Sequence, residues 1–245
     1  MNYKKKILIV GYGQDGKILH LKSLKNKDKV VILSNRKINN NLNKFVQSDI
    51  IDITNKKKIF KYLHKQKNLD IYFFATHNIS SSENSNKSIF KKNFNSNVIG
   101  LKNFLDYMTI YKKKKFKLFY ACSSHIFENS DNFPQDEKTF PLFKSEYALV
   151  KYLGLKICEY YREKNKIFCN VGILYTHVSR NLKKNFLINE LSFKIKEAIK
   201  RGKKTILVKN SHAKLDIMLA SDAVDAMIKL MKIKKSDTFI ISSNK

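Results

Sequence analysis

The stretch Lys6-Ile-Leu-Ile-Val-Gly-Tyr-Gly-Gln-Asp-Gly16 decides the fold of this chain. Its first half is a short apolar run, which predicts a buried β-strand over 6–10. Its second half places three of the seven glycines of the chain within six residues, and a helical pattern follows over 14–25. A glycine-rich turn between a strand and a helix is a place where the backbone can approach a phosphate group.

Each of the three glycines has its own expected role. Gly11 permits the tight turn, Gly13 lets the backbone approach a pyrophosphate, and Gly16 allows the helix to pack closely on the strand. Gln14 and Asp15 lie between them at the start of the helix, where the N-terminus attracts negative charge. The pattern predicts a dinucleotide site, and an ordinary tight turn is the alternative.

Outward from this turn, short apolar runs alternate with longer helical patterns. Strands that are apolar throughout and separated by helices form parallel sheets covered on both faces. We therefore predict an α/β fold with a doubly wound, Rossmann-type sheet and ligands at the carboxyl ends of its strands. The predicted strands span 6–10, 30–33, 71–75, 116–122, 167–174, 205–208 and 238–241. The predicted helices span 14–25, 54–66, 86–112, 145–164, 186–200 and 219–232.

Composition limits the classes of protein to consider. A chain of 245 residues with 43% apolar residues is long enough for one large domain with a real core. Three scattered cysteines are too few for a disulfide framework or a zinc site, which favours a cytoplasmic protein without a metal. No apolar run approaches the roughly 18–20 residues of a membrane span. The apolar run that starts at Ile7 ends at Gly11, too early for a signal peptide.

The charge balance raises the question of a nucleic-acid partner. The chain has 49 Lys and Arg against 20 Asp and Glu, a net charge of +29. Only four of the 49 are arginine, the side chain that best recognises phosphates and guanine edges. The lysines are spread along the whole chain. Nucleic acid is therefore not the expected partner.

The end of the second predicted strand bears on which dinucleotide is bound. Sites for NAD usually carry an acidic residue about 20 positions after the glycines. Here Arg36 and Lys37 follow that strand with no carboxylate beside them. Two cations suit a 2′-phosphate, so NADP is favoured over NAD. Asp49, which we expect just after a strand, would accept a hydrogen bond from an adenine amino group; a turn or a helix cap is the alternative.

A Tyr-x-x-x-Lys pair on a helix places a phenol and an ammonium on one face. The ammonium favours the phenolate, so the pair lowers the tyrosine pKa towards the range in which it can pass a proton. With 12 tyrosines among 245 residues and this lysine content, about two such pairs arise by chance. Four are present, beginning at Tyr111, Tyr147, Tyr152 and Tyr160. The pair alone therefore identifies no site.

Position selects among the four pairs. The strand over 116–122 leads into Ser123, at a carboxyl edge where a catalytic hydroxyl belongs. Tyr147 and Lys151 open the next predicted helix and can lie beside that edge. Ser123 would hold a substrate oxygen, Tyr147 would act as acid and base, and Lys151 would bind the nicotinamide ribose while tuning Tyr147. The alternative is a hydroxyl-lined strand end beside an ordinary amphipathic helix.

In their order, these motifs resemble the extended short-chain dehydrogenases/reductases, the NAD-dependent epimerase/dehydratase group that acts on nucleotide sugars. Within that group the chain is most similar to the GDP-mannose 4,6-dehydratase family. The Ser123-to-Tyr147 spacing of 24 fits that family. The fragments that carry the resemblance are Gly13-Gln-Asp-Gly16, Asn97-Val-Ile-Gly100, Ser145-Glu-Tyr-Ala-Leu-Val-Lys151, Gly172-Ile-Leu-Tyr-Thr-His-Val-Ser179, Asn185-Phe186, Lys209-Asn-Ser-His-Ala-Lys-Leu-Asp216 and Asp222-Ala-Val-Asp225.

The resemblance implies hydride transfer at sugar C4, a GDP-linked substrate and a homodimer paired through the helices near 86–112 and 145–164. It implies an NADP-binding core with the catalytic residues over 1–170, and a small, truncated substrate-binding region over 171–245 interleaved with the last strands. The implied cofactor contacts are Gly11, Gly13, Gln14, Asp15, Gly16, Arg36, Asp49, Ile50, Phe74, Ala75, Thr76, Lys151 and His177. The implied substrate contacts are Ser124, Thr176, Ser179 and Asn185.

The chain also departs from the family pattern. His125 stands where the dehydratases keep the glutamate that removes the proton at sugar C5. Histidine can serve as a base because its pKa lies near neutrality; a polar loop residue is the alternative. Leu182 and Leu215 stand where the family has arginines. The resemblance therefore leaves open a 4-keto reductase, a 4-epimerase, a 4,6-dehydratase and a non-catalytic NADP(H)-binding sensor or partner protein.

Overall fold

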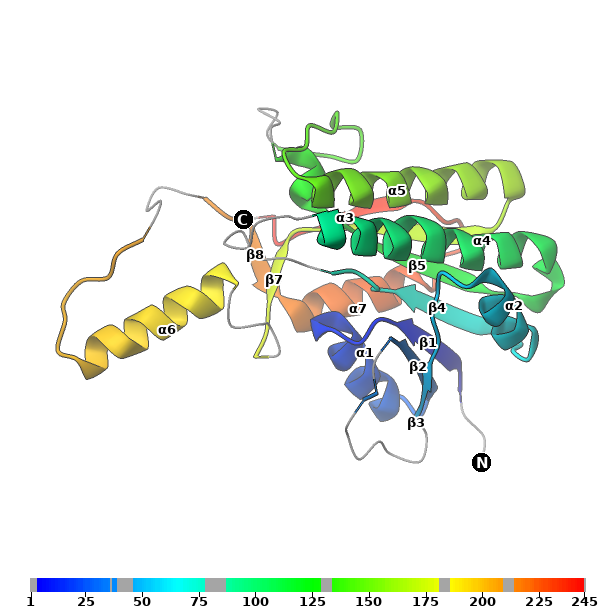
Figure 1. Ribbon diagram of the computed structural model, residues 1–245, viewed down its shortest axis with the longest axis horizontal. Coiled ribbons are helices and arrows are strands. Elements are labelled where there is room, and N and C mark those ends of the chain that lie inside the picture. Colours follow the sequence, from blue (N-terminus) through cyan, green and yellow to red (C-terminus); the bar gives the residue numbers. More distant parts are fainter. Residues whose placement is uncertain are drawn as a thin grey trace.

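The computed structural model describes residues 4–35, 37–38, 46–77, 87–128, 134–180, 186–208 and 214–244. A seven-stranded sheet with the order β3-β2-β1-β4-β5-β6-β9 forms its centre, and every neighbouring pair is parallel (Figure 1). The strands are β1 (Lys6–Val10), β2 (Lys29–Ser34), β3 (Val46–Ile50), β4 (Leu69–Phe73), β5 (Lys117–Ser123), β6 (Phe168–Leu174), β7 (Thr176–Val178), β8 (Ile217–Leu219) and β9 (Thr238–Ile241). The helices are α1 (Gln14–Lys25), α2 (Lys56–His64), α3 (Lys87–Phe94), η1 (Asn95–Gly100), α4 (Leu101–Ile110), η2 (Lys112–Lys114), η3 (Ser124–Phe127), α5 (Glu146–Asn165), α6 (Leu187–Lys200) and α7 (Ala220–Leu230). The predicted α/β fold with a doubly wound parallel sheet is confirmed.

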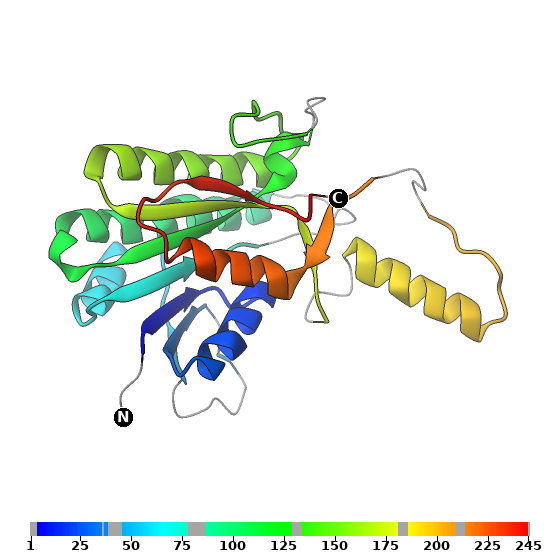
Figure 2. The same cartoon turned by 180° about the vertical axis from the view of Figure 1, so that it is seen from behind.

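Two layers of helices cover the sheet because alternate strand residues point to opposite faces. Leu8 and Val10 of β1 belong to the core under α2, α4 and α5. Ile7 and Ile9 of the same strand belong to the core under α1 and α7. Figure 2 shows α1 and α7 in front of the sheet, on the side opposite to α4 and α5. Both faces of the sheet are covered by helices and excluded from water, so nearly every residue of the central strands is apolar.

The strand order places the functional edge. β1 lies between β2 and β4. Strands β2 and β3 are added on one side of β1, and β4 and the later strands are added on its other side, so the strand order reverses at β1. In open α/β sheets ligands bind outside the carboxyl ends of the strands at such a switch point. The carboxyl ends of β1, β4 and β5 therefore mark the edge where the functional residues are to be sought.

The single long helix predicted over 86–112 is divided in the structure. A π-helical segment, η1, joins α3 to α4 and contains the buried residues Asn97 and Gly100. Asn97 donates to the carbonyl oxygen of Asn93 at 3.1 Å and to the hydroxyl of Thr76 at 3.3 Å. The wider π turn therefore contains Asn97, whose side chain fixes the segment that follows β4.

The C-terminal third differs most from the sequence prediction. Residues 205–208 were predicted as a strand, but they have no strand conformation and Leu207 is 89% exposed. The prediction was wrong because a three-residue apolar run can also lie on the surface. The described structure instead has a separate pair of short parallel strands, β7 before residues 205–208 and β8 after them. α6 extends away from the sheet in both views, with Phe193 and Ile199 exposed (Figure 1, Figure 2).

Among the described helices, none combines the length and the apolarity that a membrane span would require.

Candidate functional site

The glycine turn lies between β1 and α1 and is held against the neighbouring strands. Gly11 has a φ of +96°, which favours glycine, and its N–H donates to the Leu33 carbonyl oxygen at 3.0 Å. A Cβ on Gly11 would stand 2.7 Å from the backbone nitrogen of Ala75, and a Cβ on Gly16 would stand 2.6 Å from the Gly11 carbonyl oxygen. At these two positions a side chain would collide with the backbone, so glycine is required there by the fold itself.

Gly13 is different because the space that a side chain would occupy is open. A Cβ there would have no heavy atom within 4 Å, and its backbone is extended at the N-cap of α1. The open space lies over the first turn of a twelve-residue helix, whose N–H groups carry partial positive charge. This arrangement fits the pyrophosphate of a dinucleotide, as the sequence predicts.

The end of β4 forms the other wall of the turn. Phe74 donates its backbone N–H to the Val10 carbonyl oxygen at 2.8 Å, which brings Ala75 against Gly11. The next residue, Thr76, hydrogen-bonds to the Oδ1 atom of Asn93 at 3.2 Å. Asn93 was not singled out in the sequence, although it lies one helical turn before the Asn97 motif and could have been found by that spacing.

An ion pair joins the glycine turn to the segment after β6. His177 Nε2 lies 3.1 Å from both carboxylate oxygens of Asp15, and His177 Nδ1 lies 2.7 Å from the Tyr175 carbonyl oxygen. Burial lowers the pKa of His177, but the hydrogen bond and the charge of Asp15 outweigh it and the net pKa is raised. Both ring nitrogens face acceptors, so the imidazolium is the form that satisfies both. The residue predicted to contact the cofactor thus also neutralises the carboxylate beside the glycines.

A second link runs parallel to this ion pair. Gln14 donates to the His177 carbonyl oxygen at 3.1 Å and accepts from the Ser179 hydroxyl at 2.8 Å. Two residues implied as cofactor contacts and one implied as a substrate contact are therefore tied together directly. Sequence spacing could not show this, since Gln14 and Ser179 lie 165 residues apart.

The candidate catalytic residues meet at the carboxyl end of β5. The buried Ser123 ends this strand, and α5 starts after Ser145, whose hydroxyl accepts from the Ala148 N–H at 3.2 Å. This N-cap fixes where the helix begins and so places Tyr147 and Lys151 in its first two turns. The three predicted residues come together at one edge of the sheet.

Lys151 is buried beneath this edge. Its ammonium donates to the Ala121 carbonyl oxygen at 2.8 Å and lies 5.8 Å from the centre of the Tyr147 ring. Burial lowers the pKa of Lys151 to about 8, and the negative charge of Asp15 opposes this change. The ammonium is therefore held in place by the strand and loses its proton more easily than an exposed lysine.

The pKa of Tyr147 differs in direction from our expectation. Burial raises it, and a hydrogen bond with Ser123 lowers it only in part. We expected the Lys151 ammonium to lower this pKa. In the structure that ammonium is bound to Ala121, and desolvation of the phenol dominates. Tyr147 is therefore a protonated phenol near neutral pH.

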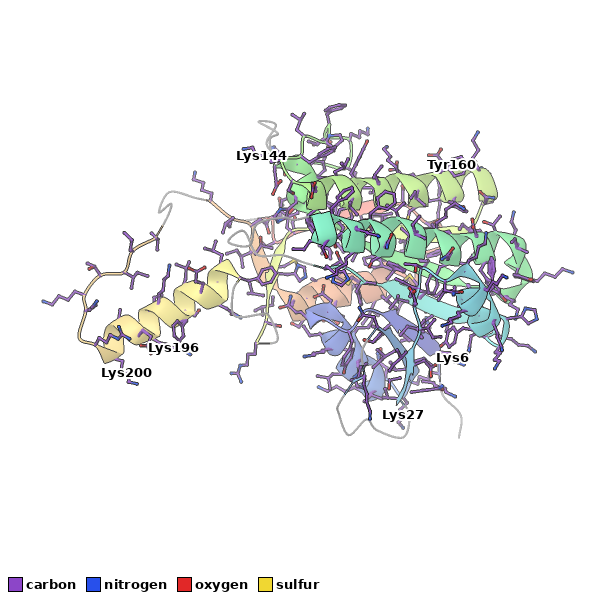
Figure 3. All side chains as sticks on the ribbon, in the orientation of Figure 1. Lys6, Lys27, Lys144, Tyr160, Lys196 and Lys200 are labelled. Atoms are coloured by element: carbon purple, nitrogen blue, oxygen red, sulfur yellow. The ribbon has the colours of Figure 1, made fainter. Side chains whose placement is uncertain are left out.

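The other three Tyr-x-x-x-Lys pairs lie elsewhere. Tyr160 is 58% exposed on the part of α5 that is far from Lys144, as Figure 3 shows. Tyr111 follows the end of α4, and Tyr152 packs against Phe143. Of the four pairs, the one predicted from its position at the start of a helix, Tyr147 with Lys151, is therefore the pair that lies at the carboxyl ends of the strands.

The remaining predicted site residues fall into three groups. Asp49 lies inside β3 instead of after a strand and accepts from the Gln47 amide at 3.1 Å, while Ile50 ends that strand and is 64% exposed. Ser124 and Thr176 lie at the carboxyl edge, in η3 and at the start of β7. Arg36 and Asn185, like Leu182, lie outside the described residues.

His125 lies in η3 and borders Tyr147, with ring centroids 5.8 Å apart. Its Nδ1 atom is hydrogen-bonded to Glu128. Glu128 was not predicted from the sequence, although its spacing of three from His125 matches one turn of a tight helix and is a signal that could have identified it.

Lysines lie on several elements of the described part of the chain. Figure 3 labels lysines on β1 (Lys6), after α1 (Lys27), before α5 (Lys144) and on α6 (Lys196 and Lys200).

Comparisons with known proteins identify the family. A family model described as GDP-mannose 4,6 dehydratase matches residues 8–245. The GDP-mannose 4,6 dehydratase of Drosophila melanogaster is 24% identical over 195 residues, which are 78% of this chain and 48% of that protein. The protein of that name from Dictyostelium discoideum is 30% identical over 132 residues, 54% of this chain and 37% of its own length. The chain thus spans less than half the length of these curated relatives.

A solved structure supports the fold. The dTDP-glucose 4,6-dehydratase of Bacillus anthracis, in complex with NAD, superimposes with a TM-score of 0.80 at 17% identity, over 98% of this chain and 76% of that one. The family model covers the sequence from β1 to the end of the chain, and the resemblance inferred from the sequence motifs is confirmed. The chain belongs to the GDP-mannose 4,6-dehydratase family of the short-chain dehydrogenases/reductases.

Proposed function

We propose that this chain is an enzyme that uses a nicotinamide cofactor to transfer hydride at C4 of a nucleotide-linked sugar. The observation that carries the proposal is the meeting of Ser123, Tyr147 and Lys151 at the carboxyl edge of the sheet, the edge on which the open Gly13 turn also lies. The glycine turn would hold the pyrophosphate and Lys151 the nicotinamide ribose. When bound, the cofactor would supply or accept the hydride.

The residues of the chain would handle the proton. A partly buried, protonated Tyr147 can donate its hydroxyl proton to a carbonyl oxygen as that oxygen becomes an alkoxide. Ser123 would hold the same oxygen by a hydrogen bond. The Lys151 ammonium, 5.8 Å from the centre of the Tyr147 ring, would stabilise the phenolate that forms when Tyr147 gives up its proton. In the opposite direction the same three groups would remove the proton from a sugar hydroxyl.

NADP is the proposed cofactor. Lys37 is exposed beyond the end of β2, and the sequence from Ser34 to Lys37 contains no carboxylate to receive a ribose 2′-hydroxyl. Calorimetric titration with NADPH and with NADH tests this. We expect NADPH to bind more tightly, and Lys37→Ala to weaken NADPH more than NADH. Equal affinity for the two cofactors would contradict the choice.

The nucleotide-sugar substrate is proposed from the family and from its relatives, which carry the name GDP-mannose 4,6 dehydratase. A GDP-linked sugar is therefore the first candidate. The reaction is either reduction of a 4-keto sugar or 4,6-dehydration. Mass spectrometry of a nucleotide-sugar panel, incubated with the protein and NADP or NADPH, separates them. Loss of one water would establish a dehydratase, and gain of two hydrogens with consumption of NADPH would establish a reductase.

A second candidate is a non-catalytic NADP(H)-binding protein that serves as a sensor or a partner. Leu215 favours it, because this 45%-exposed apolar side chain stands where the family pattern has an arginine. Such a protein would bind NADPH and leave every sugar of the panel unchanged. We also propose a cytoplasmic homodimer that pairs through α5 and the helical stretch from α3 to α4, and light scattering of the purified protein would test it. The segments after residue 170 are proposed to face the substrate.

A further inference from the structure

His125 lies where a substrate at the strand edge would be within reach. It follows Ser123 by two residues, and 56% of its side chain is exposed. Its ring meets the ring of Tyr147 at an angle of 88°, with centroids 5.8 Å apart. The imidazole and the phenol therefore border the same open edge.

Glu128 determines which nitrogen of His125 carries a proton. Burial raises the pKa of this carboxyl, but hydrogen bonds with His125, Lys144 and Ser145 outweigh burial and lower it overall. Glu128 is therefore a carboxylate near neutral pH, and a carboxylate only accepts hydrogen bonds. Because Nδ1 of His125 is bonded to Glu128, Nδ1 must donate. In the neutral imidazole the lone pair is then on Nε2.

The same carboxylate ties His125 to the helix that carries Tyr147. Its Oε2 atom accepts from the Lys144 N–H at 3.4 Å and from the Ser145 hydroxyl at 3.5 Å. Ser145 is the N-cap of α5. Glu128 thus connects η3 to the start of α5, and it fixes the position of the His125 imidazole relative to Tyr147.

We propose that Glu128 is a positioning residue that makes Nε2 of His125 a base for a carbon next to a sugar carbonyl. The inference rests on the proposed function and deepens it: it names the substrate class as nucleotide-linked 4-keto sugars that carry a hydrogen at C5. The pair takes the place of the single glutamate that the family pattern has at position 125. Glu128 acts through His125 and touches no substrate atom.

The step balances within the chain and its substrate. The C5–H bond breaks and its proton forms an N–H bond at Nε2, which gives an imidazolium beside the Glu128 carboxylate. The electron pair of the C–H bond forms a double bond to the carbonyl carbon, and the charge moves to the carbonyl oxygen, which accepts hydrogen bonds from Ser123 and Tyr147. Return of the proton from Nε2 to the carbon reverses the step, so no oxidant or reductant is consumed.

The direct test measures exchange of this carbon-bound hydrogen with solvent. The protein loaded with NADP is incubated in D₂O with a GDP-linked 4-keto-6-deoxyhexose, and the sugar is returned to H₂O before mass spectrometry. Deuterons on hydroxyl groups wash out, whereas a deuteron on carbon remains and adds one mass unit. A sample without protein gives the uncatalysed rate.

Two substitutions separate the base from the residue that positions it. His125→Ala should reduce the exchange rate at least about a hundredfold, the usual contribution of a general base. Glu128→Gln should reduce it about tenfold to a hundredfold, because an amide can donate to Nδ1 and move the proton to Nε2. Glu128→Asp should recover part of the loss. The matched control is Glu163→Gln, which removes an exposed carboxylate from the far part of α5 and should leave exchange unchanged.

Two further measurements distinguish a positioning role from a structural one. ¹⁵N NMR of the imidazole should show the Nδ1–H form in the wild-type protein and its loss in Glu128→Gln. NADPH-dependent reduction of the same sugar, which relies on Tyr147, should be retained in both variants. Exchange that needs His125 and Glu128 together with the Nδ1–H signal would support the proposal.

Two results would overturn it, and they have different meanings. If the wild-type protein reduces the keto sugar without exchanging deuterium, or if Glu128→Gln exchanges as fast as the wild type, the pair has no such role and the proposed function stands. If the wild-type protein neither reduces nor exchanges any sugar of this class, the proposed function fails with it.

Discussion

Replacing Gly13 by alanine should weaken cofactor binding without weakening the fold. A Cβ at this position meets no heavy atom within 4 Å, and the backbone has φ −87° and ψ −154°, which alanine can adopt. The gain from a less flexible unfolded chain and the loss of a favourable N-cap residue roughly cancel, so we expect the free energy of unfolding to change by less than about 0.5 kcal/mol.

The effect on binding follows from the same open space. The added methyl group would occupy the place where the backbone approaches the pyrophosphate. Loss of one hydrogen bond to a charged group costs about 1.5–3 kcal/mol, which raises the dissociation constant for NADPH about tenfold to a hundredfold.

Gly11 provides the matched comparison because its surroundings are the opposite. An alanine there would have to hold a φ of +96°, at a cost of about 1–2 kcal/mol. Its Cβ would stand 2.7 Å from the backbone nitrogen of Ala75 and 2.9 Å from the carbonyl carbon of Phe74, and overpacking against atoms that cannot rotate away costs about 1–3 kcal/mol more. We expect Gly11→Ala to lose about 2–5 kcal/mol of stability.

Urea unfolding followed by circular dichroism measures the first effect, and calorimetric titration with NADPH measures the second. NADPH binding by Gly13→Ala within threefold of the wild-type affinity would refute this prediction, since the loop would then approach no ligand. Unfolding of Gly11→Ala at the wild-type urea concentration would refute the predicted loss of stability.

Three further substitutions test other parts of the site. Tyr147→Phe should lower turnover more than tenfold and leave NADPH affinity nearly unchanged, because only the proton-carrying hydroxyl is lost; a variant that keeps more than a tenth of the rate would contradict the assignment. His177→Gln removes the ion pair with Asp15. This ion pair contributes about 1–3 kcal/mol to the free energy of unfolding. Because the pKa of His177 is raised in the folded state, the stabilisation is complete below about pH 6.5, the pKa of an unperturbed histidine, and is lost as the pH rises through the folded pKa. Urea midpoints of the variant and the wild type should therefore differ more at pH 6 than at pH 9, and a gap that is constant with pH would count against the pair. Gly154→Ala would place a Cβ 2.3 Å from the hydroxyl of the buried Tyr120, so the melting temperature should fall by several degrees, and an unchanged temperature would show that this contact yields freely.

The part of the fold that was predictable is the part in which burial and periodicity agree. β1, α1 and β9 have their predicted limits because apolar strands and a glycine turn leave few alternatives. β3 was not delimited as a strand, since Val46–Ile50 is an edge strand with three polar residues in its interior. The π-helical segment η1 was not predictable either, because its cause lies in contacts with the end of β4 and not in local propensity.

The candidate site divides in the same way. Ser123, Tyr147 and Lys151 could be selected because the fold prediction itself decided which of four similar pairs lies at a strand end. The pairing of Asp15 with His177 could not be selected, since 162 residues separate them and only the folded chain brings them together. The direction of the Tyr147 pKa was missed for another reason: desolvation depends on everything packed around a group.

The strand order has a consequence for how this chain folds while it is being made. After β3, each new strand adds to the free edge of the sheet: β4 to β1, β5 to β4, β6 to β5 and β9 to β6. No strand has to enter between two strands that are already paired, so the sheet can grow in the order of synthesis. The single return occurs when β4 comes back to β1. β1 ends at residue 10 and β4 at residue 73, so at about 5–20 residues per second the open edge of β1 waits about 3–13 seconds for the strand that covers it. During this interval the nascent chain exposes an apolar strand edge, the feature that chaperones protect and that aggregation exploits.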